Sequence, residues 1–304
     1  MRKLASAFLI FLLLCLGAAG VLYWRYTHQA TVYEPQLQPE AEASSLGNAA
    51  GPSPGAPGGS NTGVGPGGAR MGTSAEPAGG NLGGGPVLRS GESLEYDVEV
   101  ATLNSTIATI KIDTREKRDL AGKNVWHLQG FAHTGNPYRM VFELDDEFDS
   151  YSEAANLTSV QYEMHLSERG QKINSVQRML PGSEAAPAGV SAARVLPGTR
   201  DPLGLLQYLR FTNWSKTTEV RSPVYDGRKL YDVRAVLVGR GAAVKVAAGS
   251  YSANKIEIHV YDNGTEMKDA HFMLYLANDA GRTPVLMEAV LPFATARVEL
   301  TKAK

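Results

Sequence analysis

The fold of this chain is decided by the stretch Asp201-Pro-Leu-Gly-Leu-Leu-Gln-Tyr-Leu-Arg210, which has strand-like sequence on both sides. Asp201 suits a helix N-cap, because its carboxylate can accept from the free backbone N–H groups of the first turn. Pro202 suits the first helical position, where its missing N–H costs nothing. Arg210 complements the negative end of the helix dipole. The stretch therefore predicts a short helix that packs on one face of a β-sheet and divides its strands into two groups.

The buried side of this helix is indicated by an apolar stripe at helical spacing, formed by Leu205, Leu206 and Leu209. An aspartate in place of Leu206 or Leu209 is therefore expected to be strongly unfavourable, because it would bury an unpaired carboxylate. Gln207 lies off the stripe. An aspartate at that position is expected to be mild.

Alternation of apolar and polar residues dominates the chain from residue 90 onward and predicts β-strands. Those before the helix are expected at 94–100, 108–112, 124–134, 138–144, 159–166 and 172–180. Those after it are expected at 217–225, 229–238, 242–246, 250–261, 271–277, 283–291 and 297–300. The dipeptide Asp226-Gly227 is a strong hairpin signal, because its tight turn needs residues that tolerate positive φ.

About a dozen antiparallel strands, each with one polar face, predict a mainly β fold. We expect one strongly curved sheet or part-open barrel with one short central helix over residues 88–304. A two-sheet sandwich is the alternative, because periodicity alone does not distinguish the two. The segment 181–200, rich in Ala, Pro and Gly, is expected to be a loop.

The N-terminal residues 1–26 combine Arg2 and Lys3 with an apolar run of about the length needed to cross a bilayer. The run ends in Tyr23-Trp24-Arg25-Tyr26, which is typical of a membrane–water interface. We expect a signal anchor, with the remainder of the chain in the periplasm. A signal peptide cleaved after Ala19 is the alternative.

Residues 27–87 are rich in Gly, Pro and Ala and are expected to form a disordered linker, since they bury too little apolar surface to offset ordering. The literal Gly-x-Gly-x-x-Gly at 63–68 lacks the strand and helix that dinucleotide binding needs. No cofactor is therefore expected. The formal net charge of -1 leaves no basic excess for phosphates, so no nucleic-acid partner is expected either.

Candidate catalytic and metal-ligating residues are few. Ser252 and Lys255 match Ser-x-x-Lys, but strand residues three apart point to opposite faces. His127 and His133 share one strand face without further ligands, so a solvated face is favoured over a metal site. The acidic run at 145–149 lacks the glycine of a calcium loop and is interpreted as a strand junction with solvated charges.

The Asp279 and Arg282 pair flanks Ala280-Gly281, so a hairpin turn with an exposed charge pair is expected rather than a binding site. These two residues also belong to a series of short motifs in fixed order. The series is Asp146-x-Phe-x-Ser-Tyr151, the Asp201–Arg210 helix, Val224-Tyr-Asp-Gly-Arg-Lys-Leu-Tyr231, Gly249-x-Tyr251, Leu276-Ala-Asn-Asp279 and Arg282-Thr-Pro284-Val285, before a last strand closing in Glu299-Leu300.

Together these motifs resemble the exported bacterial proteins of domain-of-unknown-function family 3108, over about residues 88–302. Two positions depart from the resemblance. Tyr275 stands where the family pattern has tryptophan, and Ala294 where it has a turn glycine. The resemblance implies a β protein of a Gram-negative-type periplasm and implies no activity.

The functional expectation is a non-enzymatic periplasmic domain, tethered to the inner membrane by the N-terminal helix. It would bind an apolar ligand, such as a lipid or acyl chain, or an envelope protein partner. An apolar groove beside the helix is expected, because one helix about 15 Å long cannot cover a dozen strands. A structural or assembly adaptor of the cell envelope, without a small-molecule ligand, is the alternative.

Overall fold

The computed structural model describes residues 88–304 except 102, 104, 141–142, 169–170, 183, 187 and 293. The signal anchor predicted for residues 1–26 and the linker predicted for 27–87 lie outside the described residues. Within the part of the chain that is described, no helix is long and apolar enough to span a membrane.

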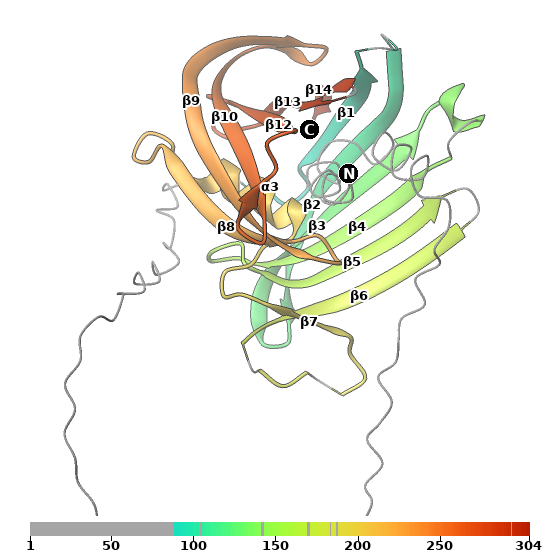
Figure 1. Cartoon of the computed structure of the whole chain (residues 1–304), viewed down its shortest axis with the longest axis vertical. Helices are drawn as coiled ribbons and strands as arrows, with labels where there is room; N and C mark the ends of the chain where they lie inside the picture. The colour runs from blue at the N-terminus through green and yellow to red at the C-terminus, as the bar shows by residue number, and fades with distance from the viewer. Residues whose placement is uncertain are drawn as a thin grey trace, which may run out of the picture. The chain divides into compact units, whose positions relative to one another are not determined.

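The described strands form a single sheet of fourteen strands, which curves strongly (Figure 1). Its order is β7-β6-β5-β4-β3-β2-β1-β14-β13-β12-β10-β9-β8, with β11 paired to β10. The strands before the helix are β1 (Ser93–Val100), β2 (Ser105–Leu120), β3 (Lys123–Thr134), β4 (Asp145–Glu153), β5 (Ser159–Glu168), β6 (Gln171–Pro181) and β7 (Ala192–Val195). Those after it are β8 (Glu219–Tyr225), β9 (Leu230–Val246), β10 (Gly249–Asp262), β11 (Thr265–Glu266), β12 (His271–Ala277), β13 (Pro284–Leu291) and β14 (Ala294–Ala303). The prediction of one curved sheet is confirmed, and the sandwich is excluded.

The segment that leads into the helix hydrogen-bonds to strands near both ends of the sheet order, β5 and β8. Thr199 accepts from the backbone N–H of Ser159 on β5, at 3.0 Å. Arg200 forms a parallel bridge with Val224 on β8. The sheet is therefore a nearly closed barrel, in which one short segment contacts both halves of the sheet.

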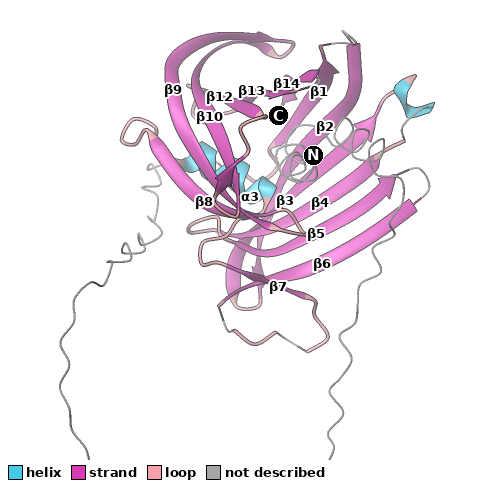
Figure 2. Cartoon of the chain, viewed as in Figure 1, coloured by secondary structure: helices cyan, strands magenta, loops and turns pink. Residues whose placement is uncertain are grey.

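The predicted helix is α3 (Pro202–Phe211), with Asp201 as its N-cap, and it lies inside the curve of the sheet (Figure 2). Asp201 Oδ1 accepts from the Gly204 N–H at 2.8 Å. Its Oδ2 accepts from the hydroxyls of Ser150 at 2.6 Å and Ser159 at 2.5 Å. Burial raises the pKa of Asp201, although these hydrogen bonds oppose the shift. The N-cap thus fastens the helix to β4 and β5 as well as starting it.

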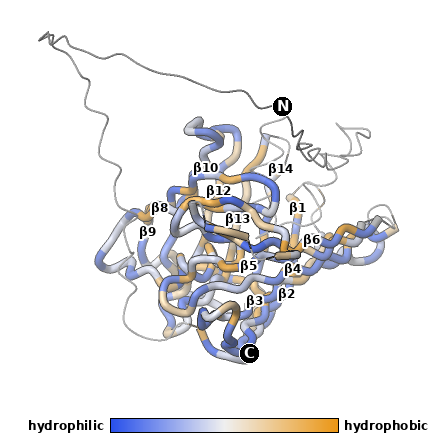
Figure 3. Tube along the Cα trace, turned by 90° about the horizontal axis from the view of Figure 1, so that it is seen from below, coloured by the Kyte–Doolittle hydropathy of each residue, from blue (hydrophilic) through white to orange (hydrophobic). Residues whose placement is uncertain are grey.

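The hydrophobic core lies between α3 and the inner face of the sheet, and apolar and polar residues alternate along the strands around it (Figure 3). Leu206 and Leu209 are each 1% exposed, which confirms the buried stripe. Gln207 is also 0% exposed, although it lies off the stripe, and the effect of an aspartate there stays a prediction. The sheet surrounds α3 on more than one side, and a position off the stripe is therefore still inside.

Three local predictions are corrected. The strand expected at 138–144 is replaced by a short 3₁₀ helix, η1 (Tyr138–Met140), followed by the two undescribed residues 141–142. The acidic run interpreted as a solvated junction belongs to β4, where Asp146 and Asp149 are 5% and 6% exposed. The loop expected at 181–200 contains β7, which pairs in parallel with β6. Strand propensity depends on the pairing partner and on burial, which the local sequence does not record.

Candidate functional site

The residues that sequence motifs singled out at the C-terminal end of α3 form a structural cluster. Arg210 is fully buried and makes two hydrogen bonds to Glu92, of 2.8 and 2.7 Å. It also donates to the carbonyl oxygen of Gly281, at 2.8 Å from Nη2. The buried guanidinium thereby joins the helix, the start of β1 and the turn between β12 and β13.

The exposed charge pair expected between Asp279 and Arg282 is wrong. Arg282 Nη1 donates to the carbonyl oxygens of Arg210, Phe211 and Thr212, at 2.8 to 2.9 Å. Asp279 instead accepts from the backbone and hydroxyl of Thr283. The last carbonyls of a helix have no partner within it, and Arg282 supplies one.

The remaining predicted motif residues also stabilise the barrel. Pro284 accepts from the hydroxyl of Tyr96, at 2.9 Å. Asp226 Oδ1 accepts from the N–H groups of Arg228 and Lys229, and Gly227 has a φ of 92°. The predicted hairpin is therefore present. Its tip faces β5 and β6, because Gly227 also accepts from the side chain of Gln177.

A different set of polar side chains lies on the outer face of the sheet, away from α3, and we call it the outer polar strip. Its members come from adjacent strands β2 to β5 and were not predicted as a site. They are Arg118, His127, Gln129, Asp149, Glu163 and His165.

Asp149 lies at the centre of the outer polar strip. Its Oδ1 atom accepts from His127 Nε2 at 2.5 Å and from Gln129 Nε2 at 2.9 Å. Burial acts to raise the pKa of Asp149, but the hydrogen bonds from His127 and Gln129 outweigh it, so the pKa is lowered. This buried carboxyl group is therefore ionised at neutral pH.

His127 is held in one tautomer by its two neighbours. Arg118 donates to Nδ1 at 2.6 Å, so Nε2 carries the proton that is donated to Asp149. The ring stacks on Tyr151 with centroids 4.7 Å apart. His127 is only 7% exposed, which corrects the expectation of a solvated histidine, whereas His133 is exposed as expected. The pKa of Tyr151 is raised to about 12, mainly by burial and to a smaller extent by the nearby charges of Glu163 and Asp149.

A cavity of about 660 Å³ adjoins the outer polar strip, and His127 and Arg118 line both. Charged groups of both signs surround it, among them Lys111, Arg115, Glu116 and Asp113. Asp113 accepts from Lys111 at 2.7 Å, and Arg115 donates to Gln129 at 2.5 Å. Burial acts to raise the pKa of Asp113, but hydrogen bonds from Lys111 and Ser93 stabilise the charged carboxylate. The pKa of Asp113 is therefore lowered. Strip and cavity thus share one hydrogen-bonded network.

A second cavity, on the inner face of the sheet, is much smaller. A cavity of about 10 Å³ lies where Leu203 meets β2, β3 and Phe148, and one water molecule needs at least that volume. Gly204, beside which a groove was expected, faces the hydroxyls of Ser152 and Ser159, each 2.9 Å from the position of an added Cβ. An acyl chain therefore finds no space at this side of the helix.

The literal Ser-x-x-Lys pair stays apart, as the strand assignment predicts. Ser252 lies on β10, and its hydroxyl oxygen accepts a hydrogen bond from Asn278 Nδ2 at 3.1 Å. The Lys255 amino group lies 5.7 Å from the centre of the Tyr275 ring. Neither side chain activates the other.

A comparison with protein families gives a match over residues 95–301 to DUF3108, described as a protein of unknown function. The chain belongs to this family. The match covers the barrel from β1 to β14, so the resemblance noted from the short motifs is confirmed. A comparison with curated proteins gives no match.

Three solved structures similar to this DUF3108 chain have sequence identities of 8 to 11% and TM-scores of 0.28 to 0.47. One is a beta-barrel-like protein of domain of unknown function DUF1849 from Brucella abortus, with 11% identity, a TM-score of 0.47, and coverage of 71% of this chain and 97% of that chain. Another is a candidate lipoprotein from Parabacteroides distasonis, with 10% identity, a TM-score of 0.33, and coverage of 71% and 96%. A third is a candidate exported protein with a YmcC-like fold from Bacteroides fragilis, with 8% identity, a TM-score of 0.28, and coverage of 71% and 96%.

Sequence reasoning on this DUF3108 domain missed Asp149, Glu163 and His165. One local signal was present, because Glu163 and His165 are two apart in a predicted strand and must share a face. The missing information was the register of β4 against β5, which sets Asp149 directly opposite Glu163.

Proposed function

We propose that this DUF3108 domain is a non-enzymatic adaptor of the bacterial cell envelope that binds a protein partner through its outer polar strip and the adjoining cavity. The partner is an envelope protein that presents a polar segment with charges of both signs. Binding of a lipid or acyl chain was the other expectation, and the interior lends it no support.

The observation that carries this proposal is the contrast between the two sides of the sheet. Inside, α3 and the core side chains leave a cavity of about 10 Å³ at the helix. Outside, a cavity of about 660 Å³ is lined by charged groups. A partner recognised there would bind by hydrogen bonds and charge rather than by burial of apolar surface.

The hydrogen-bonded network makes this surface suitable for recognition. Gln129 accepts from Arg115 and donates to Asp149, which in turn accepts from His127. Side chains already fixed by such bonds lose little conformational entropy when a partner binds.

The location that we propose is the periplasm, with the chain held at the inner membrane by residues 1–26. Arg2 and Lys3 before the apolar run favour a cytoplasmic N-terminus. Cleavage after Ala19 would instead release the domain. The mass of the mature chain distinguishes the two, because cleavage gives a chain that begins at Gly20.

The test is site-specific photo-crosslinking in living cells. A photo-reactive residue replaces Glu116 at the rim of the cavity, and a control carries it at Thr217, before β8. We expect one discrete protein adduct from position 116 that disappears when Arg115→Glu reverses a neighbouring charge. Equal adducts from both positions would contradict the proposal.

A titration with a fluorescent fatty acid separates the two expectations. The adaptor proposal expects no saturable binding to the purified chain. Saturable binding, abolished by enlarging a side chain next to the Leu203 cavity, would favour an apolar ligand instead.

A further inference from the structure

Asp149 and Glu163 place two negative charges close together on the outer face of the sheet. They are directly opposite each other on the antiparallel strands β4 and β5, with both side chains on the outer face. Like charges at directly opposed positions of a sheet repel each other. Asp149 is also 6% exposed, so water screens its charge weakly. A cation between the two carboxylates would remove this repulsion.

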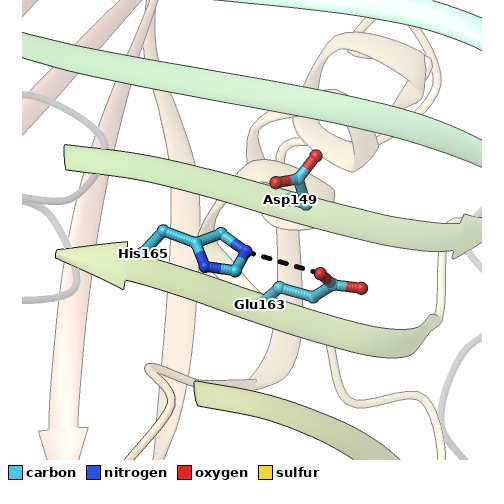
Figure 4. Close-up of side chains that lie close together, drawn as sticks. All are labelled: Asp149, Glu163 and His165. Atoms are coloured by element: carbon cyan, nitrogen blue, oxygen red, sulfur yellow. Dashed lines mark ion pairs between the residues drawn. The ribbon is translucent and has the colours of Figure 1, made fainter. Parts of the chain in front are cut away.

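His165 completes a set of ligand types at the same point. It is two residues beyond Glu163 on β5 and lies diagonally across from Asp149 (Figure 4). One ligand atom from each of the three side chains lies within 4.8 Å of the other two. The group is partly accessible, because the His165 side chain is 37% exposed and that of Glu163 is 15% exposed.

Each of the three side chains is held by a neighbour through one of its two polar atoms. His127 and Gln129 donate to Asp149 Oδ1. Gln161 donates to Glu163 Oε1 at 2.5 Å.

Asn174 Oδ1 lies 3.0 Å from His165 Nδ1 and can accept its proton, so Nε2 is left with a lone pair. Nε2 is 3.6 Å from Glu163 Oε2, within ion-pair distance when the ring is protonated (Figure 4). Partners that orient a ligand through its far atom are a regular feature of metal sites.

We propose that Asp149, Glu163 and His165 bind one divalent transition-metal ion of the zinc class on the outer face of β4 and β5. The mixed set of one nitrogen and two carboxylates favours zinc over calcium or magnesium, which prefer oxygen ligands alone. His127, Gln129, Gln161 and Asn174 act as positioning residues.

The geometry requires only a small adjustment. Ligand atoms about 2.05 Å from a tetrahedral zinc ion lie about 3.4 Å apart. Side-chain rotation must therefore bring the three atoms closer than the present 4.8 Å limit. Three protein ligands leave a fourth position open, for water or for a donor atom of a binding partner. This site lies in the strip of the proposed adaptor surface but does not depend on that function.

The test is a titration of the untagged, full-length chain with zinc in mild detergent, and calorimetry measures the binding. Cobalt(II) serves as a second probe, since its visible absorption reports tetrahedral coordination. We expect one zinc ion per chain, undiminished by millimolar Ca²⁺ or Mg²⁺. Absence of zinc binding, or displacement of zinc by Ca²⁺, would overturn the proposal.

Three variants assign the site. His165→Ala and Glu163→Gln should each weaken zinc binding by at least tenfold, and Asn174→Ala should weaken it by roughly tenfold to a hundredfold. The matched control is His259→Ala. His259 also lies between two carboxylates, but Nδ1 is 2.7 Å from Glu266 and Nε2 is 3.7 Å from Glu257, so its ligand atoms do not converge.

Retention of the fold is checked by near-ultraviolet circular dichroism. His165→Ala and Glu163→Gln alter partly exposed side chains, so at least one folded variant is expected. If a folded variant of either ligand binds zinc as the unchanged chain does, Asp149, Glu163 and His165 do not form a zinc site. An equal loss in His259→Ala would overturn the assignment as well.

Discussion

Arg210 and Glu92 are joined by two charge-assisted hydrogen bonds across 118 positions of sequence, and the arginine side chain is 0% exposed. Arg210 ends the central helix, and Glu92 directly precedes β1. The pair therefore connects the helix to a strand in the middle of the sheet order. Since the guanidinium cannot lose its proton in a protein, its charge must be compensated where it lies.

Glu92→Gln should destabilise the domain by about 3 kcal/mol, because it leaves Arg210 buried without an opposite charge. Urea unfolding of the chain without its first 26 residues measures the change. Glu95→Gln is the control, since Glu95 is on the surface and lies 3.4 Å from Lys302. Its effect should be below about 1 kcal/mol. Equal midpoints for the two variants would show that the buried pair contributes no more than a surface pair.

Arg282→Ala should destabilise the domain by about 2 kcal/mol, because it removes the donor shared by the last carbonyls of α3. Arg228→Ala is the matched control, since Arg228 is exposed in a turn. Hydrogen exchange gives a local readout, and we expect faster exchange at the end of α3 only in the first variant. Unchanged exchange there would mean that Arg282 does not cap the helix.

Gly227→Ala should cost about 1 kcal/mol more than Gly264→Ala, because the end of the buried Met164 side chain has to move. Both glycines have positive φ, of 92° and 76°, so both variants carry a similar backbone penalty. The difference lies in the surroundings, since a Cβ at Gly227 would overlap Met164, whereas nothing lies within 4 Å at Gly264. Thermal unfolding of the two variants gives the comparison. A similar midpoint for both would contradict this expectation and show that the Met164 side chain moves aside at no cost.

The local features of this fold and its single curved sheet were predictable. The contacts between residues far apart in sequence were not. The helix has its cap, proline and leucine stripe within ten residues, and the hairpin has Asp226-Gly227. By contrast, the leucine stripe did not show that Gln207 is buried, because its burial depends on strands that surround the helix. Arg282 appeared to pair with Asp279, its neighbour in sequence, whereas its actual partners are about 70 residues away.

The candidate site was hidden for the same reason. Strand alternation puts Glu163 and His165 on one face, but Asp149 joins them only through the register of β4 and β5. Aspartate is also depleted in strands, so the acidic run that contains Asp149 was interpreted as a strand junction with solvated charges. Such a conflict between local preference and the final structure is common at functional sites.

Gly204→Ala should destabilise the domain, although alanine favours an isolated helix by about 1 kcal/mol over glycine. The added Cβ would lie 2.9 Å from the hydroxyl oxygens of Ser152 and Ser159. Ser159 cannot move away freely, because it donates to Asp201 and accepts from the Asp201 N–H.

The helix would have to shift from β4 and β5, and we expect a loss of about 1 to 3 kcal/mol, as in overpacked cores. Gly204→Ala combined with Ser152→Gly should recover part of this loss, because the double change removes one of the two clashing hydroxyls. Urea unfolding of the single and double variants measures the coupling. A stabilising effect of Gly204→Ala would mean that the helix does not contact the sheet as closely as the Asp201 hydrogen bonds indicate.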